Sequence, residues 1–164
     1  MVVVLAVAVV NANANKLTDF FTEAWSQQDG SNDLFSAKEL SVDLGGVYNA
    51  AGEDAAEVTV GVSYFLTENI GFAVKTFSSY HDEILNKAEV KAILRKPAGN
   101  LALYLFGGVG RDVAGSEFYG KVGAGTELRF NAKFGSYVES GYEIRKDTDQ
   151  QSGPTVEAGV RYTF

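Results

Sequence analysis

The sequence predicts an all-β fold in which eight antiparallel strands run up and down in turn and close into a barrel. From residue 38 onward, apolar and polar residues alternate between turn-like segments, which is the period of a strand with two unlike faces. The stretch 155–164 keeps this alternation to Phe164, and such a strand would be a poor edge in water unless it paired with the first strand. The number of expected strands is even and their connections are short, which is typical of an up-and-down barrel.

Composition narrows the class of protein. A chain of 164 residues is long enough for one domain with a full core, and its 46% hydrophobic content is ordinary for a folded protein. The 18 Gly against 2 Pro favour a β-rich fold, and the absence of Cys excludes disulfides and thiolate zinc sites. The formal charge of −7 argues against nucleic acid as a partner, because phosphates require a basic patch.

The N-terminal residues predict an export signal. Residues 2–10 form an apolar run too short to span a bilayer as a helix, and Ala12 and Ala14 supply the small-x-small pattern of a cleavage site. We therefore expect a signal peptide over residues 1–14 and a mature start at Asn15. No Lys or Arg precedes the apolar run, so either the true start lies upstream or the signal is weak. A buried N-terminal strand is the alternative.

Residues 15–37 are predicted to be a separate N-terminal leader. Four large apolar residues lie near helical spacing, namely Leu17, Phe20, Phe21 and Trp25, and a polar stretch containing Gly30 follows them. This pattern indicates either a short amphipathic helix resting on a membrane interface or an irregular leader.

Residues 38–164 are predicted to form the barrel domain. The expected strands cover residues 39–48, 55–66, 70–80, 87–95, 101–110, 117–130, 133–145 and 155–164. The second shows the alternation most clearly, with Val58, Val60 and Val62 on one face and Glu57 and Thr59 on the other. The fifth is apolar on both faces. Tight turns at 67–69, 97–100 and 131–132 alternate with longer loops.

Alternation alone does not say which face is inside, because a soluble lipocalin-like barrel and a transmembrane barrel have opposite orientations. The apolar faces of the expected strands carry no charge, which both orientations permit. The polar faces carry balanced charges, which a narrow lumen would force into pairs. These residues are Asp43, Glu57, Glu89, Glu127, Glu139, Glu143 and Glu157 against Lys75, Lys91, Arg95, Lys121, Arg129 and Arg161.

Two further patterns favour the transmembrane orientation. The polar face is rich in glycine, which a crowded interior needs and a solvated exterior does not. These residues are Gly45, Gly61, Gly71, Gly108, Gly123, Gly125, Gly135, Gly141 and Gly159. Aromatic residues gather at strand ends on the apolar face, as two interfacial girdles would. They are Tyr48, Tyr64, Phe72, Tyr80, Phe118, Phe130, Phe134, Tyr142, Tyr162 and Phe164. We therefore predict a transmembrane β-barrel with periplasmic short turns and termini.

Two segments resemble a known superfamily. Residues 61–72, GVSYFLTENIGF, are similar to the strand-turn-strand of small OmpA-like, OmpW-like and OmpX-like outer-membrane barrels, and residues 158–164, AGVRYTF, to their terminal strand. The resemblance covers about residues 39–164 and is weak for any one member. It implies periplasmic chaperones, insertion into the outer membrane among lipid and lipopolysaccharide, and Tyr162 and Phe164 as a signal read by the barrel assembly machinery. Because the expected barrel reaches Phe164, we expect the peptidoglycan-binding domain of full-length OmpA to be absent. We expect a monomer.

Candidate catalytic residues are few. His81 lies in an expected outer loop with Ser79 and Glu83 nearby. The outer-membrane lipid hydrolase PagL uses a Ser-His-acid set, but its His-x-Ser order is reversed here, and a solvated loop histidine is the better interpretation. Residues 17–25 faintly resemble the leading helix of the palmitoyltransferase PagP, without a matching catalytic motif. We expect no catalytic residue, cofactor or metal.

Three functional hypotheses follow from the sequence. The first is a non-enzymatic outer-membrane barrel, structural or surface-interacting, whose lumen is plugged by ion pairs. The pairs expected to plug it join Lys75, Arg129 and Arg161 with Glu57, Glu127 and Glu157. The second is a small lipid-modifying enzyme that uses His81. The third is a soluble lipocalin-like binder of apolar ligands. Adhesion is less attractive, because the expected outer loops barely project.

Overall fold

The computed structural model describes residues 34–50, 56–79, 87–112, 117–145 and 152–164. The chain divides into two compact units, Met1–Ser31 and Asn32–Phe164, and the fold described here is that of the second. The expected signal peptide over residues 1–14, the leader as far as residue 33, and His81 lie outside the described residues and stay predictions. In the described part of the chain, no helix is long and apolar enough to cross a membrane.

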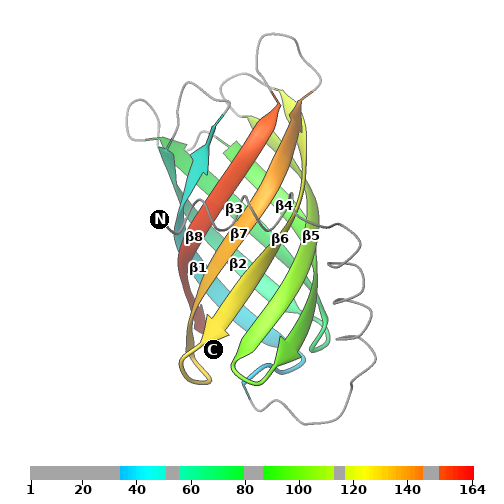
Figure 1. The fold of residues 1–164 in the computed structure, drawn as a ribbon, viewed down its shortest axis with the longest axis vertical. Coiled ribbons are helices and arrows are strands. Elements are labelled where there is room, and N and C mark those ends of the chain that lie inside the picture. Colours follow the sequence, from blue (N-terminus) through cyan, green and yellow to red (C-terminus); the bar gives the residue numbers. More distant parts are fainter. Residues whose placement is uncertain (1–33, 51–55, 80–86, 113–116, 146–151) are drawn as a thin grey trace, which may run out of the picture. The chain divides into compact units, whose positions relative to one another are not determined.

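Eight antiparallel strands form the barrel (Figure 1). They are β1 (Glu39–Asn49), β2 (Ala56–Phe65), β3 (Ile70–Ser79), β4 (Lys87–Ala98), β5 (Leu101–Asp112), β6 (Phe118–Arg129), β7 (Phe134–Arg145) and β8 (Gly153–Thr163). Each strand pairs with the next, and β8 pairs with β1, so the sheet closes on itself. Strands of 10 to 12 residues have the length needed to cross a bilayer at a tilt. The predicted fold class is confirmed.

The two ends of the barrel differ in their connections. The short turns at residues 66–69, 99–100 and 130–133 lie at one end, where the backbone of Phe164 also bonds to that of Leu40. We call this the turn-side end, and the opposite end, where the strands lead into longer connections, the loop-side end. In Figure 1 the turn-side end is at the bottom.

One turn is shorter than the sequence predicted. The expected strand 87–95 in fact continues through Pro97 to Ala98, leaving only Gly99 and Asn100 in the turn. Proline is tolerated there because β3 pairs with β4 only as far as Leu94, so no third strand requires the missing N–H. Gly99 has a φ of 66°. A two-residue hairpin turn needs such a positive φ, and glycine adopts it readily.

The apolar faces of the strands point outward and the polar faces point into the barrel. Val58 and Val60 are 51% and 49% exposed, whereas Arg161 is 2% exposed. Leu103 shares the outward face, because it pairs with the outward Thr126. This is the reverse of a lipocalin-like soluble barrel, whose apolar residues would fill the centre. A small apolar cluster does lie inside, formed by Phe65, Ala73, Ile93, Tyr104 and Phe106.

Glycine on the inward face makes room for large inward side chains, as Tyr137 shows. Its hydroxyl lies where side chains on Gly45 and Gly159 would have to be, since an added Cβ would come within 2.5 and 2.6 Å of it. At Gly159 the Cβ would also lie 2.4 Å from the carbonyl oxygen of Leu44, which belongs to the neighbouring strand. Only glycine fits at this level of the β1–β8 seam.

The exterior carries aromatic residues near both ends. At the turn-side end, Phe134 packs on Tyr162, and Tyr162 on Phe164, with ring centroids 4.9 and 5.1 Å apart. Phe118 and Tyr142 are exposed toward the loop-side end, while Tyr80 lies outside the described residues. Because β4 and β5 are longer than expected, two cations join the outward face, Lys96 on β4 and Arg111 on β5. Both lie near strand ends, where long cationic side chains can reach an interface.

Candidate functional site

The lumen holds every charged residue that the sequence assigned to the polar faces. Each is at most 6% exposed. The side chains concerned are those of Asp43, Glu57, Lys75, Glu89, Lys91, Arg95, Lys121, Glu127, Arg129, Glu139, Glu143, Glu157 and Arg161. The strand period explains this placement, because every second residue of each strand faces the same side of the sheet. The inward charges fall into three clusters along the barrel.

The turn-side cluster consists of Glu39, Asp43, Arg95, Glu127, Arg129 and Arg161. Arg129 joins two of its carboxylates, because its guanidinium donates to both Glu39 and Glu127. Arg95 also donates to Glu39, with both of its donor-to-oxygen distances at 3.3 Å. The two arginines reach the backbone of the adjacent turns as well, where Arg95 donates to Glu68 O at 2.8 Å and Arg129 to Ala132 O at 3.4 Å.

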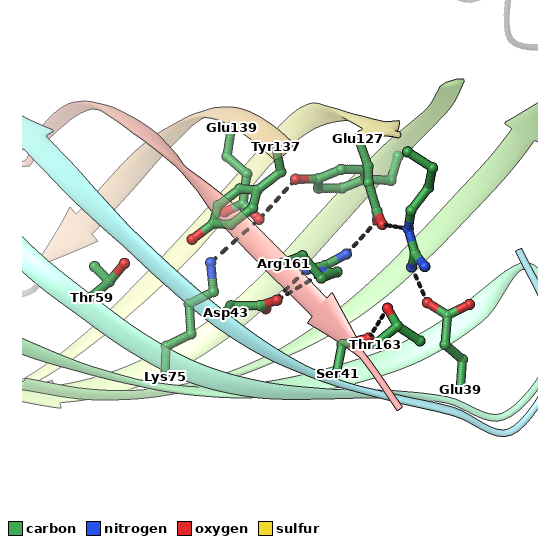
Figure 2. A network of polar contacts seen from close by, with 12 residues as sticks. Glu39, Ser41, Asp43, Thr59, Lys75, Glu127, Tyr137, Glu139, Arg161 and Thr163 are labelled. Carbon is green, nitrogen blue, oxygen red and sulfur yellow. Dashed lines mark hydrogen bonds and ion pairs between the residues drawn. The ribbon is translucent and has the colours of Figure 1, made fainter. Parts of the chain in front are cut away.

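Arg161 extends this cluster across the seam between the first and last strands. Asp43 of β1 lies directly opposite Arg161 of β8 in the register. Arg161 Nε donates to Asp43 Oδ1 at 2.6 Å and Nη2 to Oδ2 at 2.9 Å, which is a bidentate pair. Its remaining terminal nitrogen donates to Glu127 (Figure 2). One buried guanidinium therefore connects β1 and β8 with β6.

The central cluster consists of Lys75, Lys91, Glu139 and Glu157. Lys75 Nζ lies 2.6 Å from Glu157 Oε1 and 3.6 Å from Glu139 Oε1. Lys91 Nζ lies 2.5 Å from Glu139 Oε2. These pairs cross the barrel, since lysines from β3 and β4 meet glutamates from β7 and β8. The two lysines balance the two glutamates.

Three hydroxyl groups donate hydrogen bonds to the central glutamates. Tyr104 donates to Glu139 Oε1 at 3.0 Å, and Tyr137 donates to Glu157 Oε1 at 2.8 Å. Thr59 donates to the same Glu157 oxygen at 3.1 Å. Buried charge is tolerated when it is both paired and hydrogen-bonded, and every charge of the central cluster is paired. Of the glutamate oxygens in this cluster, Glu157 Oε2 has no hydrogen-bond partner among the described residues. In Figure 2 the side chains of Lys75, Tyr137 and Glu139 lie close together in this part of the lumen.

The loop-side cluster carries more acidic than basic groups. Its carboxylates are Glu57, Glu89, Asp112, Glu117 and Glu143, and its cations are Lys87, Lys121 and Arg145. Lys87 pairs with Glu57 at 2.9 Å, and Arg145 pairs with Glu143 at 2.6 Å. Arg145 also lies 3.7 Å from Asp112 and 3.9 Å from Glu117.

Two loop-side residues have weaker partners. The nearest donor to Glu89 is the Tyr119 hydroxyl at 3.4 Å, and Glu89 Oε1 has no hydrogen-bond partner among the described residues. Lys121 forms no ion pair with any described residue, and its ammonium lies 5.8 and 5.9 Å from the rings of Phe77 and Phe106. The pairing of charge is therefore less complete here than in the other two clusters.

The structure adds inward residues that the sequence analysis did not name as part of the site. Glu39 shares the face of Ser41 and Asp43, and Lys87 shares the face of Glu89, so the strand period was a sufficient signal for both. Tyr104 was hidden in a strand that is apolar on both faces. Phe35 had no such signal, because it precedes the first strand.

The candidate catalytic and metal-binding groups were also compared with the described residues. No cluster of three or more His, Cys, Asp or Glu among them could hold a metal ion. The acidic and basic groups of the turn-side and central clusters are engaged with one another. Ser79 ends β3, and His81 lies outside the described residues, so the lipid-modifying hypothesis gains no support.

Comparisons with known proteins agree with the fold. No protein-family model matches the chain, and neither does any curated protein. Among solved structures, the chain is similar to the N-terminal β-barrel domain of Pseudomonas aeruginosa OprF, with a TM-score of 0.63 and 18% identity over 79% of this chain and 99% of that one.

Designed proteins give the same result. A de novo transmembrane β-barrel matches with a TM-score of 0.62 and 18% identity over 78% of this chain and 97% of that one. A second design, solved by NMR in solution, matches with a TM-score of 0.57 and 23% identity over 83% of this chain and 97% of that one. The chain therefore has the fold of the small outer-membrane β-barrels, as the sequence predicted.

Proposed function

We propose that the chain is a non-enzymatic integral protein of a bacterial outer membrane, with a lumen closed by ion pairs and a structural or surface-interaction role. The observation that carries this proposal is the combination of an apolar exterior with a lumen of buried, paired charges. A soluble protein with this exterior would expose a continuous apolar surface to water. Hydrocarbon covers that surface at no such cost.

The paired charges support a closed lumen. An ion crossing the barrel would pass the central cluster, where Lys75 and Lys91 are in contact with Glu139 and Glu157. It would next meet the Arg161–Asp43 pair. Separating a buried pair exposes two desolvated charges, which is costly. The same pairs engage the acidic and basic side chains of the central and turn-side clusters with one another.

The expected partners follow from the membrane location. We propose that lipid and lipopolysaccharide surround the exterior, and that periplasmic chaperones and the barrel assembly machinery act during insertion. Tyr162 and Phe164 stack on the exterior at the turn-side end, where an assembly signal would be accessible. A monomer is expected because the closed sheet leaves no strand edge without a neighbour.

Planar-bilayer recording tests the closed lumen. The purified, folded wild-type protein is expected to give at most minute current steps. The matched variant is Lys75→Ala with Lys91→Ala, which removes both central cations and should increase the step size. Stable large steps from the wild-type protein would contradict the ion-pair plug.

Membrane fractionation combined with gel migration tests the location. A folded outer-membrane barrel is expected in the outer-membrane fraction, and the unboiled sample should migrate differently from the boiled one. Recovery in the soluble fraction without detergent would refute the membrane proposal whatever the lumen conducts.

A further inference from the structure

The chain immediately before β1 lies against the turn-side end of the lumen. Phe35 precedes the first strand, yet it is 0% exposed. Its ring centroid lies 4.9 Å from the guanidinium carbon of Arg95 and 5.0 Å from that of Arg129. Both arginines belong to the turn-side cluster. Phe35 therefore packs against two buried guanidinium groups of this cluster.

The guanidinium group of Arg95 contacts aromatic rings and a carboxylate at the same time. The Phe65 ring also lies against this guanidinium, with a centroid distance of 3.5 Å. The N–H groups meanwhile donate to Glu39 and to the Glu68 carbonyl. Stacked rings exclude water from a guanidinium plane while its hydrogen bonds run in the plane. Arg95 is 0% exposed as a result.

The backbone of residues 34–38 is attached to the same charges. The Ser36 N–H donates to Glu39 Oε2 at 3.2 Å, and Arg95 Nη2 lies 3.5 Å from the Ser36 carbonyl oxygen. Lys38 has a φ of 60°, a left-handed conformation that reverses the chain direction before β1 and is unfavourable for a residue other than glycine.

The attachment of this segment differs from that of the strands. The ladder between β1 and β2 begins at the Glu39–Phe65 pair, so residues 34–38 stand outside it. Ring stacking and two weak hydrogen bonds hold the segment in place, and the strained conformation of Lys38 opposes them. Such an attachment can be released while the barrel stays folded.

We propose that residues 34–38 form a removable stopper, in which Phe35 closes the turn-side mouth of the lumen and its withdrawal admits water to Arg95 and Arg129. This inference rests on the proposed closed lumen and adds a conformational device to it. The stopper is an intramolecular ligand for an aromatic-binding site built from two guanidinium groups and the Phe65 ring. The position of Phe35 controls the access of water from the turn-side end only as far as the turn-side cluster, because the central cluster lies deeper in the barrel.

Arginine modification tests the stopper in the folded full chain. Phenylglyoxal is applied to the detergent-folded protein, and the modification rate of each arginine is measured by peptide mass spectrometry. In Phe35→Ala, Arg95 and Arg129 should react at least about tenfold faster than in the wild type, given the strength of desolvated cation–π contacts. Arg161, which lies beyond the mouth, should remain unreactive.

A matched control removes a phenylalanine–arginine contact from the exterior. Phe118 lies 5.5 Å from Arg111 on the outward face, so Phe118→Ala should leave the rates at Arg95 and Arg129 unchanged. Equal rates in Phe35→Ala and the wild type would overturn the proposal. So would a wild-type rate equal to that of the urea-unfolded chain.

A second pair of variants changes the segment without touching Phe35. Lys38→Val disfavours the left-handed conformation and should increase modification of Arg95 and Arg129, whereas Lys38→Gly favours it and should decrease modification. This pair decides the question if Phe35→Ala does not fold, and identical rates in the two variants would overturn the stopper. Current recording tests the proposed closed lumen separately from the stopper. A conducting wild-type protein would contradict the closed lumen but would not change the result of the arginine modification.

Discussion

The turn-side and loop-side halves of the lumen differ in how completely their buried charges are paired and hydrogen-bonded. In the turn-side cluster, three arginines meet three carboxylates, and each guanidinium contacts at least one of them. In the loop-side cluster, carboxylates outnumber cations, and Glu89 Oε1 and Glu117 Oε2 have no hydrogen-bond partner among the described residues. In the central cluster only Glu157 Oε2 lacks such a partner, and in the turn-side cluster every carboxylate oxygen of the described residues has one.

The difference follows from the kind of cation in each half of the lumen. Arginine presents a planar fork that can satisfy several carboxylate oxygens at once, so a small number of guanidinium groups can neutralise a narrow cross-section. Among the described residues, buried charge is therefore paired more completely toward the turn-side end than toward the loop-side end. Matched substitutions in the two halves should differ in their cost.

The largest contrast is expected between Arg161→Met and Lys121→Met. Loss of Arg161 leaves Asp43 buried without its bidentate partner, which should cost about 3–5 kcal/mol of unfolding free energy. Lys121 forms no ion pair with a described residue, so its loss should cost less than about 1 kcal/mol. Urea unfolding in lipid vesicles, followed by the gel shift, measures both.

A double variant separates lost pairing from lost packing. Arg161→Met with Asp43→Asn removes both partners and should recover part of the stability lost in Arg161→Met. A cost for Lys121→Met equal to that for Arg161→Met would remove the distinction between the two halves.

The next contrast concerns glycine. A Cβ at Gly159 would lie 2.4 Å from the backbone oxygen of Leu44, which cannot move without distorting β1, so Gly159→Ala should cost about 1–3 kcal/mol. At Gly110 the three atoms nearest to the Cβ all belong to the Tyr119 side chain, the first at 2.1 Å, and the end of a side chain moves at less cost than the backbone. Gly110→Ala should therefore cost less. The midpoints of urea unfolding give the ranking, and the reverse order would show that Tyr119 is held as rigidly as the seam.

Hydroxyl removal should give a smaller contrast. The Tyr137 hydroxyl donates to the buried Glu157 at 2.8 Å, so Tyr137→Phe should cost about 1.5–3 kcal/mol. The Tyr119 hydroxyl lies 3.4 Å from Glu89, and Tyr119→Phe should cost less than about 1 kcal/mol. Each variant keeps its ring, so the difference in unfolding free energy reports the hydrogen bond alone. Equal losses would place Glu89 in the same dry environment as Glu157.

The smallest effect is expected at the loop-side rim. Lys87 is partly exposed and pairs with Glu57, so Lys87→Met should cost about 1 kcal/mol or less. The loss should shrink at high salt, because solvent ions screen a pair near the surface. Unfolding at low and high salt measures it. A loss that does not change with salt would mean that the rim is as well shielded as the turn-side cluster.

The alternation of residues was sufficient to predict the strands and the closure, whereas the orientation of the faces needed further signals. Val58 and Val60 point outward and Arg161 points inward because a two-residue period admits only two arrangements, and glycine and the terminal aromatics indicated the correct one. Strand ends were less certain. Pro97 looked like the start of a turn, and its place in β4 depends on where β3 ends.

The choice of partners inside the lumen could not be read from the sequence. Lys91 and Glu139 are separated by 48 residues and meet across the barrel, where the tilt of the strands and the reach of the side chains decide the contact. Glu57 was expected to join the Lys75, Arg129 and Arg161 network and instead pairs with Lys87. Phe35 belongs to no periodic pattern, so only the folded structure connects it to Arg95.

A spin label on the outward face tests the central claim, the orientation of the barrel, most directly. The chain has no cysteine, so Val60→Cys provides a unique attachment point in the middle of β2, and Ala132→Cys in a turn provides a solvated control. In lipid vesicles, the label at position 60 should be relaxed by dissolved oxygen and shielded from a water-soluble nickel chelate, with the opposite result at position 132. A label at position 60 that the nickel chelate reaches and oxygen does not would contradict an apolar face in contact with lipid.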